Sequence, residues 1–128
     1  FFVGGDQKKL LDAIEELDLV HEIKVYHKKG TLIGGTSAGA SILGTHIPYW
    51  SDKEEKMIYY RGLDLVPNSI IDQHFTQRNR KKRLEEGTSR FQDSTGYGID
   101  EDTAIIFYPD GKKDEIGNGN ILTIKSKD

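Results

Sequence analysis

A serine between glycines is the strongest chemical signal in the sequence. Residues 35–39 read Gly-Thr-Ser-Ala-Gly and fit the pattern G-x-S-x-G, after a short apolar segment and before a run of small residues. On a strand-to-helix turn of this kind the hydroxyl of Ser37 is exposed and can act as a nucleophile. The backbone N–H of Ala38 would lie at a helix N-terminus, where it can stabilise an oxyanion. A plain glycine-rich turn and a phosphate-binding loop are the alternatives, although no lysine follows as in a P-loop.

A serine nucleophile needs a base, and His74 is the best placed of the four histidines. It follows the apolar pair Ile70-Ile71, in the company of Asp72 and Gln73. We therefore expect it at the carboxyl end of a buried strand, where the functional groups of open α/β sheets gather. A purely structural histidine is the alternative.

Three acidic residues, Asp100, Glu101 and Asp102, follow another strand-like segment. A catalytic histidine needs a carboxylate that orients the ring and stabilises the imidazolium. Any of the three could serve, and an acidic surface turn is the alternative.

A basic segment lies shortly after His74, because residues 78–86 read RNRKKRLEE. On a helix this order opposes the macrodipole, which favours acids at the start and bases at the end. Arg80 and Arg83 would share one helix face, and Arg78 would precede the helix. Such a cluster can hold carboxylates in bidentate fashion. A solvated basic face is the alternative, and we prefer it for the two lysines.

The composition limits the other possibilities. The chain has 128 residues, 18 Lys+Arg against 21 Asp+Glu, a net charge of −3 and no cysteine. The length fits a single domain over residues 1–128. The lack of cysteine excludes disulfides, thiolate metal sites and a cysteine nucleophile, and nothing indicates a metal or another cofactor. The acidic total argues against nucleic-acid binding, and no apolar run is long enough to span a membrane. We expect a cytoplasmic location.

Strand-like and helix-like segments alternate in the first half of the chain, and hairpin patterns fill the last third. This predicts an α/β fold with a mainly parallel sheet and a C-terminal part rich in β-hairpins.

Because the chain opens in an apolar strand without a methionine, we expect N-terminal elements to be missing and the sheet to be uncovered near residues 1–5. Residues 45–62 are expected to form a surface loop. Strands are predicted at 1–3, 31–33, 69–71, 97–99, 103–108 and 121–124, and helices at 6–17, 19–29 and 79–86, the last one ending at Gly87.

Four blocks of the sequence resemble cyanophycinases and their relatives in the peptidase E family of serine peptidases. The blocks are FVGGDQ at residues 2–7, GGTSAGA at 34–40, IDQHF at 71–75 with the arginines that follow, and GYGIDEDTA at 96–104. The resemblance implies a flavodoxin-like three-layer α/β/α sandwich, related to class I glutamine amidotransferases. It also implies a serine peptidase that acts on β-aspartyl or acidic peptides such as cyanophycin. The identity of the peptide is left open, as is a homodimer.

The resemblance also implies roles for individual residues. The nucleophile is Ser37, the base is His74 and the third member is Glu101, with Asp52 or Asp102 as alternatives for that acid. The implied oxyanion site is formed by Gly5 and Ala38. The residues that resemble the family's substrate contacts are Gln7, Asp72, Gln73, Arg78, Arg80 and Arg83.

Two other functions compete with this prediction. One is a catalytically incomplete fragment or a binding protein of the same fold, which keeps the pocket without turnover. The other is a nucleic-acid-binding module that uses the basic segment, against which the net charge of −3 stands.

Overall fold

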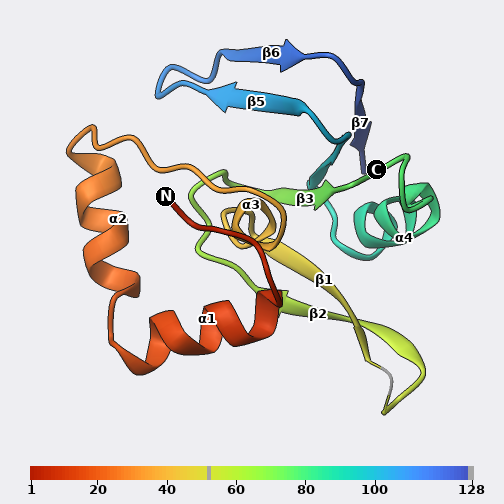
Figure 1. The fold of residues 1–128 in the computed structure, drawn as a ribbon, viewed down its shortest axis with the longest axis horizontal. Helices are drawn as coiled ribbons and strands as arrows, with labels where there is room; N and C mark the ends of the chain where they lie inside the picture. The colour runs from red at the N-terminus through yellow and green to blue at the C-terminus, as the bar shows by residue number, and fades with distance from the viewer. Residues whose placement is uncertain (52, 127–128) are drawn as a thin grey trace.

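A computed structural model describes residues 1–51 and 53–126 of the chain, and Figure 1 shows its α/β architecture. The helices are α1 (Gln7–Glu16), α2 (Val20–Lys28), α3 (Ala38–Ser41) and α4 (Lys81–Arg90). The strands are β1 (His46–Ser51), β2 (Lys56–Arg61), β3 (Ser69–Gln73), β4 (Thr95–Ile99), β5 (Thr103–Phe107), β6 (Lys113–Gly117) and β7 (Ile121–Lys125). The predicted α/β class is confirmed. None of the helices in the described ranges has the length and hydropathy needed to cross a membrane.

The described strands form one mixed sheet and two hairpins. In the mixed sheet β4 lies between β3, to which it runs parallel, and β7, to which it runs antiparallel. Strands β1 and β2 form one antiparallel hairpin, and β5 and β6 form the other. Parallel pairing is therefore confined to β3–β4 and an isolated bridge between Phe2 and Gly35 in the described chain. The sheets are less parallel than expected, because short turns join β1 to β2 and β5 to β6 and allow only antiparallel pairing there, and β7 runs antiparallel to β4.

The prediction of a surface loop over residues 45–62 is wrong. Strands β1 and β2 pair there along their whole length, and Ile47, opposite Tyr60, is fully buried. Aromatic and β-branched side chains paired across two strands stabilise such a hairpin. The proline at position 48 and the charged turn conceal the strand pattern in the sequence. Figure 1 shows the far end of this hairpin extending away from the rest of the fold.

Two hydrophobic clusters hold the elements together. The first joins Leu11 and Ile14 of α1 to Ile42, Ile47 and Leu63. Helix α1 begins at an N-cap, since the side chain of Asp6 accepts a hydrogen bond of 2.9 Å from the N–H of Lys9. The second cluster places α4 against β3 and contains Ile70, Phe75 and Leu84.

Helix α4 continues to Arg90 and passes through Gly87, so the predicted end of the helix at that glycine is wrong. An added Cβ at Gly87 would lie 2.8 Å from Cδ1 of Ile70 and 3.2 Å from the ring of Tyr59. Glycine is needed here because the helix packs closely on β3, and not because the helix ends.

The segments predicted as strands at residues 1–3 and 31–33 adopt little regular structure beyond the Phe2–Gly35 bridge. Several of their large apolar side chains are exposed, with Phe1 at 83%, Val3 at 66% and Leu32 at 88%.

Candidate active site

Ser37 lies on a sharp turn directly before α3. Its backbone angles are φ 55° and ψ −123°, in a region that residues other than glycine rarely occupy. The flanking glycines are required by space, because a Cβ on Gly35 would overlap the carbonyl of Gly39, and one on Gly39 would overlap the carbonyl of Phe2. The G-x-S-x-G pattern therefore encodes a strained, closely packed turn, as predicted for a nucleophile.

The hydroxyl of Ser37 faces an imidazole that in turn faces a carboxylate. Ser37 Oγ lies 3.0 Å from Nε2 of His74, and Nδ1 of the same ring lies 2.8 Å from Oε1 of Glu101. An ionised carboxylate can only accept, so Nδ1 of His74 carries the hydrogen. The lone pair of Nε2 is then free to accept the proton of Ser37, which is the arrangement of a nucleophile, a base and an orienting acid.

The structure describes one of the two alternatives for the acid. Asp102 Oδ2 accepts a hydrogen bond of 2.6 Å from the side chain of Asn118. Asp52 lies outside the described residues. Among the acids that the structure describes near His74, the one in contact with the ring is Glu101.

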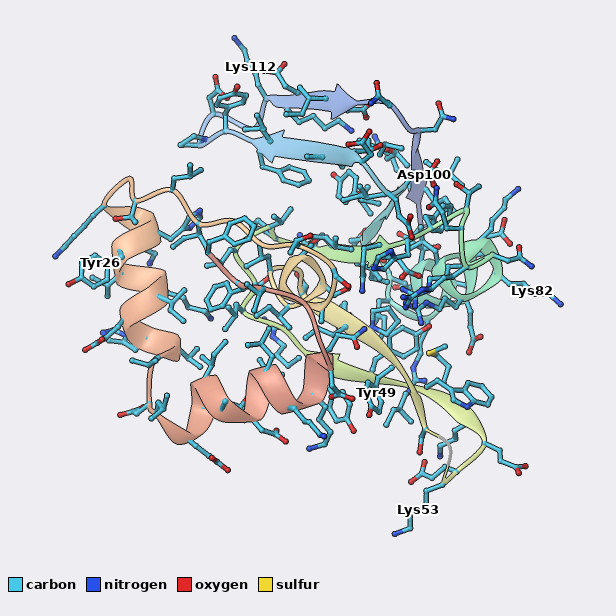
Figure 2. All side chains as sticks on the ribbon, in the orientation of Figure 1. Tyr26, Tyr49, Lys53, Lys82, Asp100 and Lys112 are labelled. Atoms are coloured by element: carbon cyan, nitrogen blue, oxygen red, sulfur yellow. The ribbon has the colours of Figure 1, made fainter. Side chains whose placement is uncertain are left out.

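The β3–β4 pairing explains how the base and the acid meet. The parallel register pairs Gln73 with Ile99, the last residues of the two strands. His74 and Glu101 follow at the same edge of the sheet, as the sequence predicts for functional groups of an α/β fold. Figure 2 labels Asp100, the neighbour of Glu101, beside β7.

Two backbone amides are candidates for stabilising an oxyanion next to Ser37. An added Cβ on Gly4 would lie 3.1 Å from Cβ of Ser37, so the Gly4-Gly5 turn approaches the hydroxyl closely. In the described residues, none of the recorded hydrogen bonds uses the N–H of Gly5 or of Ala38. Both amides are thus available to an incoming oxygen atom.

Two of the arginines that follow His74 contact a buried carboxylate. Asp72 is fully buried and accepts two hydrogen bonds from Arg83, one of 2.6 Å from Nε and one from Nη2. Arg80 Nη1 adds a contact of 3.3 Å to Asp72 and donates to the carbonyl of Gln73 at 2.8 Å. Burial and the charge of Arg83 lower the pKa of Arg80, while Asp72 opposes this effect. Two guanidinium groups and one carboxylate leave the cluster with one net positive charge.

The remaining predicted substrate contacts, Gln7, Gln73 and Arg78, have separate partners. The side chain of Gln73 contacts the hydroxyl of Ser41, and Nε2 of Gln7 lies 3.5 Å from the carbonyl oxygen of Pro48. Arg78 is exposed, and its backbone N–H donates to the carbonyl of His74 at 2.9 Å. The structure therefore brings Asp72, Arg80 and Arg83 together, with Gln7 at the start of α1.

Comparison with known proteins identifies the family. The profile of Peptidase family S51 matches residues 1–115. The chain belongs to peptidase family S51. It is 35% identical over 97% of its length to a cyanophycinase of Geminocystis herdmanii, and 34% identical over its whole length to one of Synechococcus elongatus. It is also 35% identical to a cyanophycinase of Trichormus variabilis over 97% of its length. The chain spans 48%, 42% and 44% of these three relatives, respectively.

Membership of family S51 confirms the resemblance seen in the sequence blocks. Sequence reasoning nevertheless missed two polar residues at this S51 site, Thr76 and Gln77, which contact Asp100 and the backbone of Glu101. They lie two and three residues after His74. The polar residues after His74 were the available signal, but the pattern does not indicate which residues they contact.

Proposed function

We propose that this protein is a serine-type peptidase that hydrolyses β-aspartyl peptide bonds, with cyanophycin as the substrate suggested by the names of its relatives. The observation that carries the proposal is the chain of contacts from Ser37 to His74 to Glu101, at 3.0 Å and 2.8 Å. These three residue types in this order perform acyl transfer without a cofactor.

In the proposed reaction Ser37 Oγ attacks the carbonyl carbon of the scissile bond while Nε2 of His74 takes its proton. Glu101 stabilises the imidazolium that forms. The amides of Gly5 and Ala38 donate to the oxyanion of the tetrahedral intermediate. His74 then returns the proton to the leaving amine, and water releases the acyl group from Ser37 by the same steps in reverse order.

The charge of the neighbouring cluster favours an acidic substrate. A β-linked aspartyl unit keeps a free α-carboxylate, which an arginine can bind. The net positive charge around Asp72 and the exposed side chain of Arg78 support binding of that carboxylate beside Ser37.

We further propose that the described elements belong to a flavodoxin-like three-layer sandwich. Helices α3 and α4 both contact β3, the strand that leads to His74. The parallel pair β3–β4 and the parallel bridge between Phe2 and Gly35 are the pairings that such a sheet would contain.

A fluorophosphonate probe and product analysis test the function together. Labelling should occur in the wild-type protein and in Ser89→Ala, which changes an exposed serine of α4, and it should vanish in Ser37→Ala.

Mass spectrometry should detect products from cyanophycin and from β-aspartyl dipeptides, but not from the matched α-aspartyl dipeptides. Turnover should fall on the order of 10³-fold or more in Ser37→Ala. Binding of the β-aspartyl peptides without labelling or turnover would instead favour the binding-protein alternative.

A further inference from the structure

The backbone pairing of β3 with β4 ends shortly before the proposed base, His74, and the proposed acid, Glu101. The pairing ends at Gln73 and Ile99, and His74 has a φ of 49°, which turns the backbone out of the strand. One further backbone bond, from the N–H of Phe75 to the carbonyl of Ile99 at 3.2 Å, follows this turn. Beyond it, side chains join the two segments.

Asp100 forms the central link. Its Oδ1 accepts hydrogen bonds from the N–H of Thr76, at 3.0 Å, and from the hydroxyl of the same residue. Its Oδ2 accepts from the N–H of Asn120 at 3.1 Å. The carboxylate is 7% exposed, and the bonds from Thr76 lower the pKa of Asp100 and so favour its ionised form. One side chain thus connects the segment after β3, the end of β4 and the start of β7.

Gln77 adds a second link next to the first. Its Oε1 accepts a hydrogen bond of 3.1 Å from the N–H of Glu101. The side chain of Glu101 is 54% exposed, so packing restrains it little, and its position depends on its backbone. That backbone is held by Gln77 directly and by Asp100 immediately before it.

We propose that Asp100 and Thr76 are positioning residues that set the contact between His74 and Glu101. Thr76 lies two residues after the base, and Asp100 precedes the acid, so their bonds fix the separation of the two segments. In metal sites, partners that orient a ligand change affinity or activity by about 10-fold to 100-fold without touching substrate, and we expect the lower end of that range here. The inference deepens the proposed function, since it assigns a role within the same site and rests on that function.

Four variants separate positioning from general effects of charge. In Asp100→Asn the amide NH₂ cannot accept the hydrogen bonds that the carboxylate accepts. Thr76→Val removes the hydroxyl bond and keeps the backbone bond, while Thr76→Ser keeps both. Asp102→Asn is the matched control, because it removes the same charge on the other flank of Glu101 and its carboxylate bonds Asn118 instead.

The first readout is the ¹⁵N and ¹H NMR signal of the His74 ring, which needs no substrate. The wild type, Thr76→Ser and Asp102→Asn should show a hydrogen on Nδ1, with the downfield proton of a bond to a carboxylate. Asp100→Asn and Thr76→Val should lose that proton signal and show a mixture of tautomers. The second readout is hydrolysis of a β-aspartyl dipeptide, where kcat should fall about 10-fold in these two variants. KM should stay within about twofold.

Several results would overturn the proposal. It fails if Thr76→Val and Asp100→Asn keep the Nδ1 signal, if Asp102→Asn loses it equally, or if Thr76→Ser behaves like Thr76→Val. Should Asp100→Asn not fold, Thr76→Val decides, because it replaces an exposed residue. A wild type that shows the Nδ1 signal but hydrolyses no β-aspartyl peptide refutes the proposed function and leaves the positioning result standing.

Discussion

Nδ1 of His74 lies 2.8 Å from Oε1 of Glu101, and the contact joins residues that lie one and two positions beyond the ends of two paired parallel strands. Glu101→Gln should therefore lower kcat on a β-aspartyl peptide by on the order of 10² to 10⁴-fold, because the amide permits the wrong tautomer of the imidazole. Steady-state kinetics and the rate of fluorophosphonate labelling should fall together, since both need an activated Ser37.

The other two acids serve as controls for this assignment. Asp102→Asn and Asp52→Asn remove the same charge and should leave kcat close to that of the wild type. A loss in either variant that equals the loss in Glu101→Gln would show that Glu101 is not the orienting acid.

Arg83 and Arg78 should have different effects on stability and binding. Arg83→Met leaves the buried carboxylate of Asp72 with only Arg80 and should lower the free energy of unfolding by about 3–5 kcal/mol. Arg78→Met alters an exposed side chain and should change it by less than about 0.5 kcal/mol. Urea unfolding measures both. Recovery of stability in the double variant Asp72→Asn/Arg83→Met would support the buried pair, whereas equal stability of Arg83→Met and the wild type would contradict it.

Arg78→Met also tests binding of the substrate carboxylate. If Arg78 binds the α-carboxylate of a β-aspartyl unit, the variant should raise KM for acidic peptides without changing the labelling rate of a neutral serine probe. Loss of both activities would indicate damage to Ser37 or His74 instead, and no change in either would leave the basic segment as a solvated surface.

His46 should make the folded state less stable in mild acid. Its ring stacks on Phe91, with the ring centres 3.6 Å apart, and burial, assisted by the charge of Arg61, lowers the pKa of His46. Below about pH 6.5, the usual histidine pKa, the unfolded chain therefore takes up a proton more readily than the folded one. This part of the stability is complete above that pH and decreases as the pH falls toward the lowered pKa. His46→Phe should reduce the loss of Tm between about pH 7.5 and about pH 5.5, and an unchanged loss would contradict this origin.

Gly87→Ala should destabilise the protein, whereas the same replacement at an ordinary glycine inside a helix stabilises it. Alanine normally stabilises a helix interior by about 1 kcal/mol relative to glycine. Here the added methyl group would lie 2.8 Å from Ile70, and we expect a net loss of about 1–3 kcal/mol. Ser89→Ala, at an exposed position of the same helix, should instead stabilise by up to about 0.5 kcal/mol. Chemical denaturation of both variants compares them, and stabilisation by Gly87→Ala would show that α4 packs less closely.

The motifs predicted that Ser37 and His74 would meet, and the resemblance selected Glu101 among the three acids that the strand pattern left open. In the structure β3 precedes His74 and β4 precedes Glu101, whereas the segment before Ser37 forms only an isolated bridge between Gly35 and Phe2. Short motifs and the ends of strands are local properties that periodicity and turn residues reveal. The roles of these residues in catalysis stay predictions. The α/β class followed from the alternation of elements in the same way.

The environment of the arginines could not be predicted. Arg83 was expected to face a substrate carboxylate, and in this structure it holds Asp72, eleven residues earlier in the chain. Which carboxylate an arginine meets depends on how α4 packs on β3, and the side-chain pattern does not specify that packing. The β1–β2 hairpin was missed for a related reason, since its stability comes from cross-strand pairs such as Ile47 and Tyr60.

The isolated bridge between Phe2 and Gly35 should break more easily than the β3 ladder. The turn before Ser37 is tied to the first residues by two backbone bonds, from Phe2 N–H to Gly34 O at 2.9 Å and from Thr36 N–H to Phe2 O at 3.0 Å. So few bonds, beside the exposed side chains of Phe1 and Val3, open at a lower free energy than the buried β3 ladder. The amides of residues 2 and 36 should therefore exchange with deuterium before those of β3. Dilute denaturant should accordingly separate the first residues from the turn before Ser37, while the base and the acid remain in contact.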